Sequence, residues 1–298
     1  MLDYAALFAL AAVIREGSFE RAAQALFVTP SAVSQRIRAL EERVGCALVV
    51  RGQPCRATEA GRRLCQHVDR VRLLEQELQG TLPALAPEGV TRVALPIAVN
   101  ADSLATWFAP AVAAYAADAP VLVQLSVDDQ DHTTDWLRSG AVLAAVTGTA
   151  RPPAGFNSRP LGAMRYLAAA SPAYMARHFG HGVGAVSLAR APSLVFNTKD
   201  DLQARWVRRL CHKDVELPRH AVPSAHAFVA AALAGMGWGL HPHALIAPHL
   251  AQGSLVELVS NSSLDVPLFW QHARAASSLI DGLSREVVAA ASRSLQPP

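Results

Sequence analysis

The chain has 298 residues, of which 51% are hydrophobic, so it can build two or three domains with cores of their own. We expect no membrane span and no signal peptide, because no run of about 20 apolar residues is present and the N-terminus carries no basic leader. The net charge of +3 arises in residues 1–65, where nine arginines face six acids, whereas residues 66–298 are neutral. A basic module on a neutral body predicts a polyanionic partner for the module alone.

Two helices are predicted at the start of the chain. Apolar residues recur at helical spacing over 3–15, and this pattern ends near Gly17. Ser18 then stands where an N-cap is needed for a second helix over 19–27. Alanines on the inner face of that second helix let another helix approach closely.

A third helix, over 30–45, carries the polar surface of the module. Thr29 can cap it, Pro30 suits its first position, and Gly45 supplies its end. With the second helix it matches a helix-turn-helix, in which polar side chains read base edges while Thr29 and the helix N-terminus hold a phosphate. A plain helical hairpin with a solvated face is the alternative. The open side of the third helix carries Ser31, Ser34, Gln35, Arg36 and Arg38.

A wing is predicted after the third helix. A short apolar run over 47–50 leads into a turn with Gly and Pro that bears Arg51 and Arg56. Arginines on such a wing can reach the neighbouring groove or the backbone of a duplex. The predicted DNA-binding residues are therefore Ser18, Thr29, Pro30, Ser31, Ser34, Gln35, Arg36, Arg38, Arg51 and Arg56.

The strings GSFERAAQAL, TPSAVSQRIRALEERVG and TEAG (58–61) resemble the winged helix-turn-helix of LysR-type transcriptional regulators. The resemblance covers residues 2–60 and implies a double-stranded DNA operator and RNA polymerase as partners. We assign 1–58 to this DNA-binding domain.

A long helix from 58 to 80 and a hinge containing two prolines are predicted next, and together they form a linker over 59–90. The apolar seam of the helix can pair two chains, which suits DNA binding because a two-fold dimer presents two recognition helices. Packing of the helix on its own domain is the alternative. The seam consists of Leu64, Val68, Val71, Leu74 and Leu78.

Beyond residue 90, strands alternate with helices, which predicts an α/β body with mostly parallel strands. The family resemblance implies a periplasmic-binding-protein-like effector domain over 91–298, made of two subdomains, 91–160 plus 265–298 and 161–264. The whole fold is thus predicted as an all-α winged helix-turn-helix joined by a long helix to this domain. Candidate strands are 92–99, 121–127, 142–148, 165–171, 193–197, 238–242, 255–259 and 268–273.

Ligands of open α/β sheets bind beyond the carboxyl ends of the strands. The first strand ends at Asn100, and Asn100, Asp102 or Ser103 can cap the helix that follows, whose positive end favours a carboxylate. Plain capping without a ligand is the alternative. The second strand ends in an acidic cluster with Asp128 and Asp129, which a bound cation would relieve. The combination fits a zwitterion with an extra positive group, such as lysine or arginine.

The strings NADSLATW and VDDQD resemble the ArgP/LysG branch of the LysR-type regulators, which senses basic amino acids and activates genes for their export. The resemblance implies that Ser103 takes the α-carboxylate and that Asp128 or Asp129 faces a ligand amine. The same comparison implies that the remaining site residues are Thr147, Asn197, Asp200, Ser224 and His226.

Two other classes of protein compete with this interpretation. An enzyme is disfavoured, because the chain contains no GxSxG, P-loop, GxGxxG or HExxH motif, and no cofactor is expected. The other is an architectural DNA-binding protein with an unliganded body. Neither the histidines near 241–249 nor the four cysteines have metal-site spacing, and the cysteines favour reduced thiols in a cytoplasmic protein. We therefore predict a ligand-gated regulator that is a homodimer or, as the family resemblance implies, a homotetramer.

Overall fold

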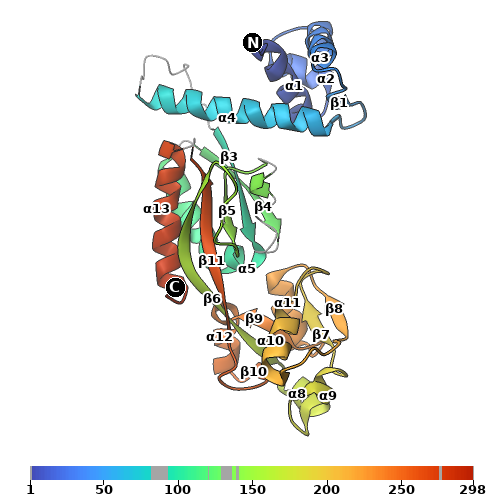
Figure 1. Cartoon of the computed structure of the whole chain (residues 1–298), viewed down its shortest axis with the longest axis vertical. Coiled ribbons are helices and arrows are strands. Elements are labelled where there is room, and N and C mark those ends of the chain that lie inside the picture. The colour runs from blue at the N-terminus through green and yellow to red at the C-terminus, as the bar shows by residue number, and fades with distance from the viewer. Residues whose placement is uncertain are drawn as a thin grey trace. The chain divides into compact units, whose positions relative to one another are not determined.

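The computed structural model describes residues 2–81, 93–119, 121–128, 136–138, 141–274 and 277–297. The chain divides into two compact units, the first running to Val93 and the second beginning at Ala94 (Figure 1). Residues 82–90 of the predicted hinge and the acid Asp129 lie outside the described residues.

The first unit is a helical bundle with a small wing, as predicted. The helices begin at the capping residues that the sequence predicted. Ser18 caps α2 by accepting from the amides of Glu20 and Arg21, and Thr29 caps α3. Gly45 ends α3 in a left-handed conformation, with φ of 79°, that suits glycine. The elements are α1 (Tyr4–Glu16), α2 (Phe19–Ala25), α3 (Pro30–Val44), β1 (Val49–Val50), β2 (Arg56–Ala57) and α4 (Glu59–Thr81).

The apolar seam of α4 is divided between two environments. Its first half packs on its own domain, which was the alternative to chain pairing, and pairing through the second half stays a prediction. Val68 is fully buried and Leu64 partly buried in the core that α1, α2 and α3 form. Leu74 and Leu78 are each 49% exposed. The division arises because the core ends partway along the helix, and Arg72 over the ring of Phe8, at 5.3 Å, lies near that end.

The second unit is built around one mixed sheet. Its first half comprises β3 (Val93–Asn100), α5 (Ala101–Ser103), the π-helical turn η2 (Leu104–Phe108), α6 (Ala109–Asp118), β4 (Val121–Asp128), β5 (Ala144–Thr147) and β6 (Phe156–Ala170). The rest comprises α8 (Pro172–Phe179), α9 (Ala185–Leu188), β7 (Ser193–Val195), α10 (Leu202–Cys211), β8 (Arg219–Ala221), α11 (Ala225–Leu233), β9 (Gly239–Pro242), α12 (His243–Ala251), β10 (Val256–Glu257), β11 (Leu264–Ala273) and α13 (Ser277–Ser294).

The strand order is β10-β6-β11-β5-β3-β4, with β9 also on β6 and a separate β7-β8 pair. Most described ladders are antiparallel, which corrects the expectation of mostly parallel strands; β3/β5 and β7/β8 are parallel. Alternation of strands and helices along the chain does not reveal that β6 and β11 return past each other as one long ribbon (Figure 1).

The sequence did not predict the first half of β6, because Pro160 and Gly162 are residues typical of turns and rare inside strands. Gly162 has φ of +124°, and a Cβ there would collide with the backbone of Gln296. The short polar strand β8 was also missed, since it has no apolar alternation.

The ribbon of β6 and β11 runs between two packed regions (Figure 1). At one end, η2, α6 and α13 pack together, and the buried Trp270 donates its indole hydrogen to Ser284 Oγ at 2.7 Å. At the other end, α11, α12 and β7 share a second core with Leu167 of β6. The arrangement places the carboxyl ends of β3 and β5 between the two regions.

Candidate functional site

The polar side of α3 faces outward, as a recognition helix requires. Its inner residues Val33, Ile37 and Leu40 are buried at 0, 1 and 3% exposure. On the other side the predicted contacts are exposed, apart from Ser34 and Arg36, which are half-buried. The exposed set is Thr29, Pro30, Ser31, Gln35 and Arg38 on the helix and Arg51 and Arg56 on the wing.

Several of these side chains already have partners. Arg38 pairs with Glu42 at 3.2 Å, and Arg51 lies over the ring of Phe19 at 5.3 Å. The side chains of Arg36 and Arg56 make no hydrogen bond or ion pair within the described parts of the chain. Ser18, besides capping α2, donates to Glu20 at 2.6 Å, and this hydrogen bond lowers the pKa of Glu20. Arg36 and Arg56 are therefore the two predicted arginine contacts whose side chains can take a new anionic partner without breaking a described interaction.

The wing is fixed to α3 and α4 by backbone contacts. Glu41 of α3 accepts from the amides of Leu48 and Val49, at 2.7 and 3.3 Å. Thr58 donates to the carbonyl of Ala47 at 2.8 Å. At Gly61 any side chain would collide with the carbonyl of Leu48, so glycine permits α4 to approach the wing.

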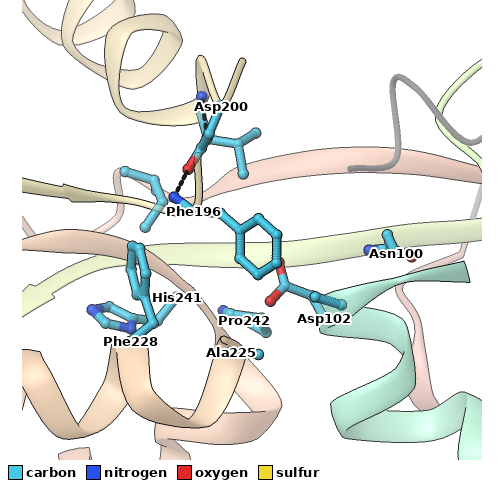
Figure 2. Close-up of a pocket in the computed structure, with 11 residues that line it drawn as sticks. Asn100, Asp102, Phe196, Asp200, Ala225, Phe228, His241 and Pro242 are labelled. Atoms are coloured by element: carbon cyan, nitrogen blue, oxygen red, sulfur yellow. Dashed lines mark hydrogen bonds between the residues drawn. The ribbon is translucent and has the colours of Figure 1, made fainter. Parts of the chain in front are cut away.

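A crevice in the second unit lies at the carboxyl end of β3 (Figure 2). Its free volume is about 30 Å³, which suffices for a water molecule and not for an amino acid. Residues from β3 and α5 form one side, and residues from the β7–α10 loop, α11 and β9 form the other. They are Asn100, Ala101, Asp102, Phe196, Asp200, Leu202, Ala225, Phe228, Leu240, His241 and Pro242.

Two carboxylates line the crevice from opposite sides. Asp102 accepts from the hydroxyl of Tyr166 at 2.8 Å, and Figure 2 shows its carboxylate pointing toward the ring of Phe196. Asp200 accepts from the amides of Phe196 and Leu202 at 2.8 and 3.1 Å. Burial raises the pKa of Asp200, and these amide hydrogen bonds oppose that rise. The lining is thus acidic on both sides.

The capping role expected at the end of β3 is wrong for Asn100. Asn100 is the residue before α5, but its side chain makes no capping hydrogen bond. Helical backbone begins at once at Ala101, so Ser103 lies inside the helical segment, and the Asp102 carboxylate is bound to Tyr166. The amide of Asn100 and the hydroxyl of Ser103 are buried without hydrogen-bond partners among the described residues. Buried polar groups of this kind need a partner such as water or a ligand.

Thr147 is fully buried at the end of β5 and donates to the carbonyl of Thr149 at 3.1 Å. The parallel register that pairs Ala98 with Ala145 brings Thr147 and Asn100 to the same end of the sheet. Thr147 does not line the crevice in this structure.

The other predicted site residues, where described, are not part of the crevice lining. Ser224 is exposed and caps α11, and His226 is exposed on the same helix. The side-chain oxygen of Asn197 accepts from the amides of Lys199 and Asp200. Asp128 is the last residue of β4. The structure therefore brings together Asn100, Asp102 and Asp200 from the predicted set.

The sequence analysis did not predict the aromatic residues of the crevice lining. Phe196, Phe228 and His241 all face the crevice region (Figure 2). The ring of His241 is fully buried, edge-on to Phe228 at 5.1 Å. Burial lowers the pKa of His241 to about 4, with the backbone of Ala169 weakly opposing, so the ring is neutral at pH 7. His241 lies near the end of the predicted strand 238–242, and this position could have identified it in the sequence as a residue of the crevice.

Within the described residues, no group of three or more His, Cys, Asp or Glu side chains converges as metal ligands. Among the same residues, none of the helices is long and apolar enough to cross a bilayer.

Comparison with known proteins gives the family. A model described as the LysR substrate binding domain matches residues 88–292, and one described as a bacterial regulatory helix-turn-helix protein of the lysR family matches residues 4–62. The chain belongs to the LysR family. It is a LysR-type transcriptional regulator of the ArgP/LysG type, with an N-terminal helix-turn-helix and a C-terminal substrate-binding domain.

Three relatives illustrate the similarity. ArgP of Pseudomonas fluorescens strain Pf0-1 is 46% identical over 297 residues, which cover 100% of this chain and 99% of the relative. The crystal structure of ArgP from Mycobacterium tuberculosis superimposes with a TM-score of 0.84 at 43% identity, with both chains fully covered. LysG of Corynebacterium glutamicum with bound effector Arg has a TM-score of 0.73 at 39% identity and covers 99% of this chain and 100% of LysG.

Proposed function

We propose that this LysR-type regulator binds a basic amino acid, lysine or arginine, in the crevice and thereby controls a gene for a transporter or exporter of that amino acid. The observation that carries the proposal is the placement of two carboxylates, Asp102 and Asp200, on opposite sides of one crevice. The arginine bound to LysG, a relative of 39% identity, supports the same ligand class.

The crevice has complementary groups for both ends of such a ligand. A carboxylate offers about four acceptor sites, so accepting the hydrogen bond from Tyr166 does not prevent Asp102 from also accepting from a ligand cation. The side-chain amide nitrogen of Asn100, which is buried without a partner among the described residues, can donate to an α-carboxylate. We propose that the hydroxyl of Ser103, equally unpartnered but outside the present lining, joins it when the crevice widens. Asp102 thus replaces Asp128 or Asp129 as the first choice for the acid that meets the ligand cation.

Entry of the amino acid requires the crevice to widen, because its present free volume is about 30 Å³. Phe196 lies at its centre, with its ring between the two acidic sides (Figure 2). A ligand that binds the widened form shifts the population toward that form. We propose that this change is passed to the paired DNA-binding modules, where it alters operator bending and contact with RNA polymerase.

The proposed assembly has two parts. Leu74 and Leu78 on α4 leave an apolar surface for pairing two chains. The edge strand β4 exposes Leu122, Leu125 and Val127, which suit a contact between effector domains in a tetramer. The domain divisions at 58, 90, 160 and 264 remain part of this proposal.

Titration calorimetry on the full-length protein tests the ligand class. We expect saturable binding of arginine or lysine, with citrulline, the neutral isostere of arginine, bound about tenfold more weakly or worse, since a charge-assisted hydrogen bond is lost. Asp102→Asn should weaken arginine binding by a similar factor.

Asp118→Asn removes an exposed acid of α6 outside the crevice and serves as the matched control, with unchanged binding expected. Equal affinity for citrulline and arginine would exclude a cation-selective site. Full arginine affinity in Asp102→Asn would show that another acid meets the ligand.

A further inference from the structure

A second cavity, outside the crevice, lies at the start of α12. Its free volume is about 220 Å³, which is enough for a small organic molecule. Its walls come from η2, β6, the first turn of α12 and the end of the chain at 294–296. The proposed function uses none of this space, although Pro242 borders both cavities.

The polar part of the lining favours an anion. The helix α12 starts at His243 without a side-chain cap, so its first amides and the positive end of its dipole are available. Arg165 lines the cavity, and its side chain is 39% exposed even though it is bound to Asp265. No acidic side chain is among the described residues that line the cavity.

A buried donor gives an independent indication of a missing partner. Trp107 of η2 lines the cavity and is 3% exposed, and its indole N–H has no hydrogen-bond acceptor among the described residues. A buried donor without an acceptor costs free energy unless a water or ligand satisfies it. Trp107 also sits in a π-helical turn, a distortion frequently found at functional sites.

The apolar part of the wall comes chiefly from Met164, Leu245 and Leu295, and the remaining polar residues of the wall are Thr106, His243, Ser294 and Gln296. We propose that this cavity binds a small monocarboxylate with a compact apolar body. The carboxylate lies at the N-terminus of α12 near Arg165, and the apolar body lies against Met164 and Leu245. This binding does not depend on which effector the crevice takes.

The probe for the test is 4-methylpentanoate, titrated into the full-length protein and followed by ligand-observed NMR. We expect saturable binding, with the neutral 4-methylpentanamide bound about tenfold more weakly or worse, because it lacks the charge that the helix end and Arg165 attract. Asp102→Asn, a change in the crevice, should leave this binding unaltered.

Two variants fill the cavity from different walls: Ala244→Phe from α12 and Ala105→Phe from η2. Each should abolish probe binding while thermal unfolding shows a folded protein. Ala251→Phe, at the exposed end of the same helix and outside the cavity, is the matched control and should bind the probe normally.

Absence of saturable binding to the wild type overturns the proposal. So does binding that survives in both filling variants, that is displaced by arginine, or that is equally strong for the amide.

Discussion

His241 shows at the residue scale how burial sets the chemistry of the crevice. Its imidazole is fully buried in the wall of the crevice and packs edge-on against Phe228. In this environment the charged form lacks water, so the ring stays neutral and acts as an aromatic wall. The acidic character of the crevice comes instead from Asp102 and Asp200.

The lowered pKa of His241 predicts a pH-dependent stability. An unfolded histidine titrates near its ordinary pKa of 6.5, so between pH 6.5 and about 4 the unfolded state binds more protons than the folded state. The free energy of unfolding should therefore fall as the pH drops through this window, by about 3 kcal/mol at most from this residue.

Urea unfolding of wild type and His241→Gln between pH 4 and pH 7 measures this contribution as the difference between two slopes. The variant should have a shallower pH dependence across the window. Parallel curves for the two proteins would show that His241 is not the group responsible.

At the scale of elements, α4 serves two packing functions along one apolar stripe. Its first half completes the core of the DNA-binding module, where Val68 has no exposed surface. Its second half presents Leu74 and Leu78 at 49% exposure. The sequence pattern is the same in both halves, so the difference lies in how far the rest of the core extends.

A pair of alanine variants separates the two functions. Val68→Ala should lower the free energy of unfolding by about 2 kcal/mol through a buried cavity, with the oligomeric state unchanged at high protein concentration. Leu74→Ala should instead weaken self-association while costing the module little stability. Sedimentation equilibrium measures self-association of both variants, and urea unfolding measures their stability. If Val68→Ala weakened association while Leu74→Ala lowered stability, or if Leu74→Ala left association unchanged, the two functions assigned to α4 would be contradicted.

At the scale of the whole molecule, DNA binding and ligand binding are assigned to separate compact units. The excess positive charge lies in the first 65 residues, and the acidic crevice lies in the second unit. Variants in one unit should therefore change one binding reaction and leave the intrinsic affinity of the other unit largely intact.

Arg36→Ala tests this separation. It should weaken binding to a duplex selected from genomic DNA by about tenfold, since one lost base or phosphate contact costs roughly 1–3 kcal/mol, and arginine binding should be unchanged. Arg190→Ala removes the same charge from an exposed site in the second unit and is the control. Fluorescence anisotropy with the duplex and calorimetry with arginine provide the measurements; unaltered duplex binding by Arg36→Ala would exclude α3 as the recognition helix.

The sequence by itself determined the winged helix-turn-helix, the long connecting helix and the family. Capping residues such as Ser18, Thr29 and Gly45 act over a few neighbouring residues, and the apolar spacing of α3 is a local pattern, so both can be read without long-range information. The sequence also predicted the amide and the two acids that meet in the crevice, which are Asn100, Asp102 and Asp200.

Only the tertiary structure decided the antiparallel ribbon of β6 and β11, the aromatic wall of Phe196, Phe228 and His241, and the bond between Asp102 and Tyr166. Tyr166 lies 64 positions beyond Asp102, and Phe196 and His241 come from loops and strands far apart in the chain. Such contacts depend on strand register and on which elements pack together. The spacing of residues along the chain predicts a helix face or a cap, because both are local. It does not predict which distant segments pair.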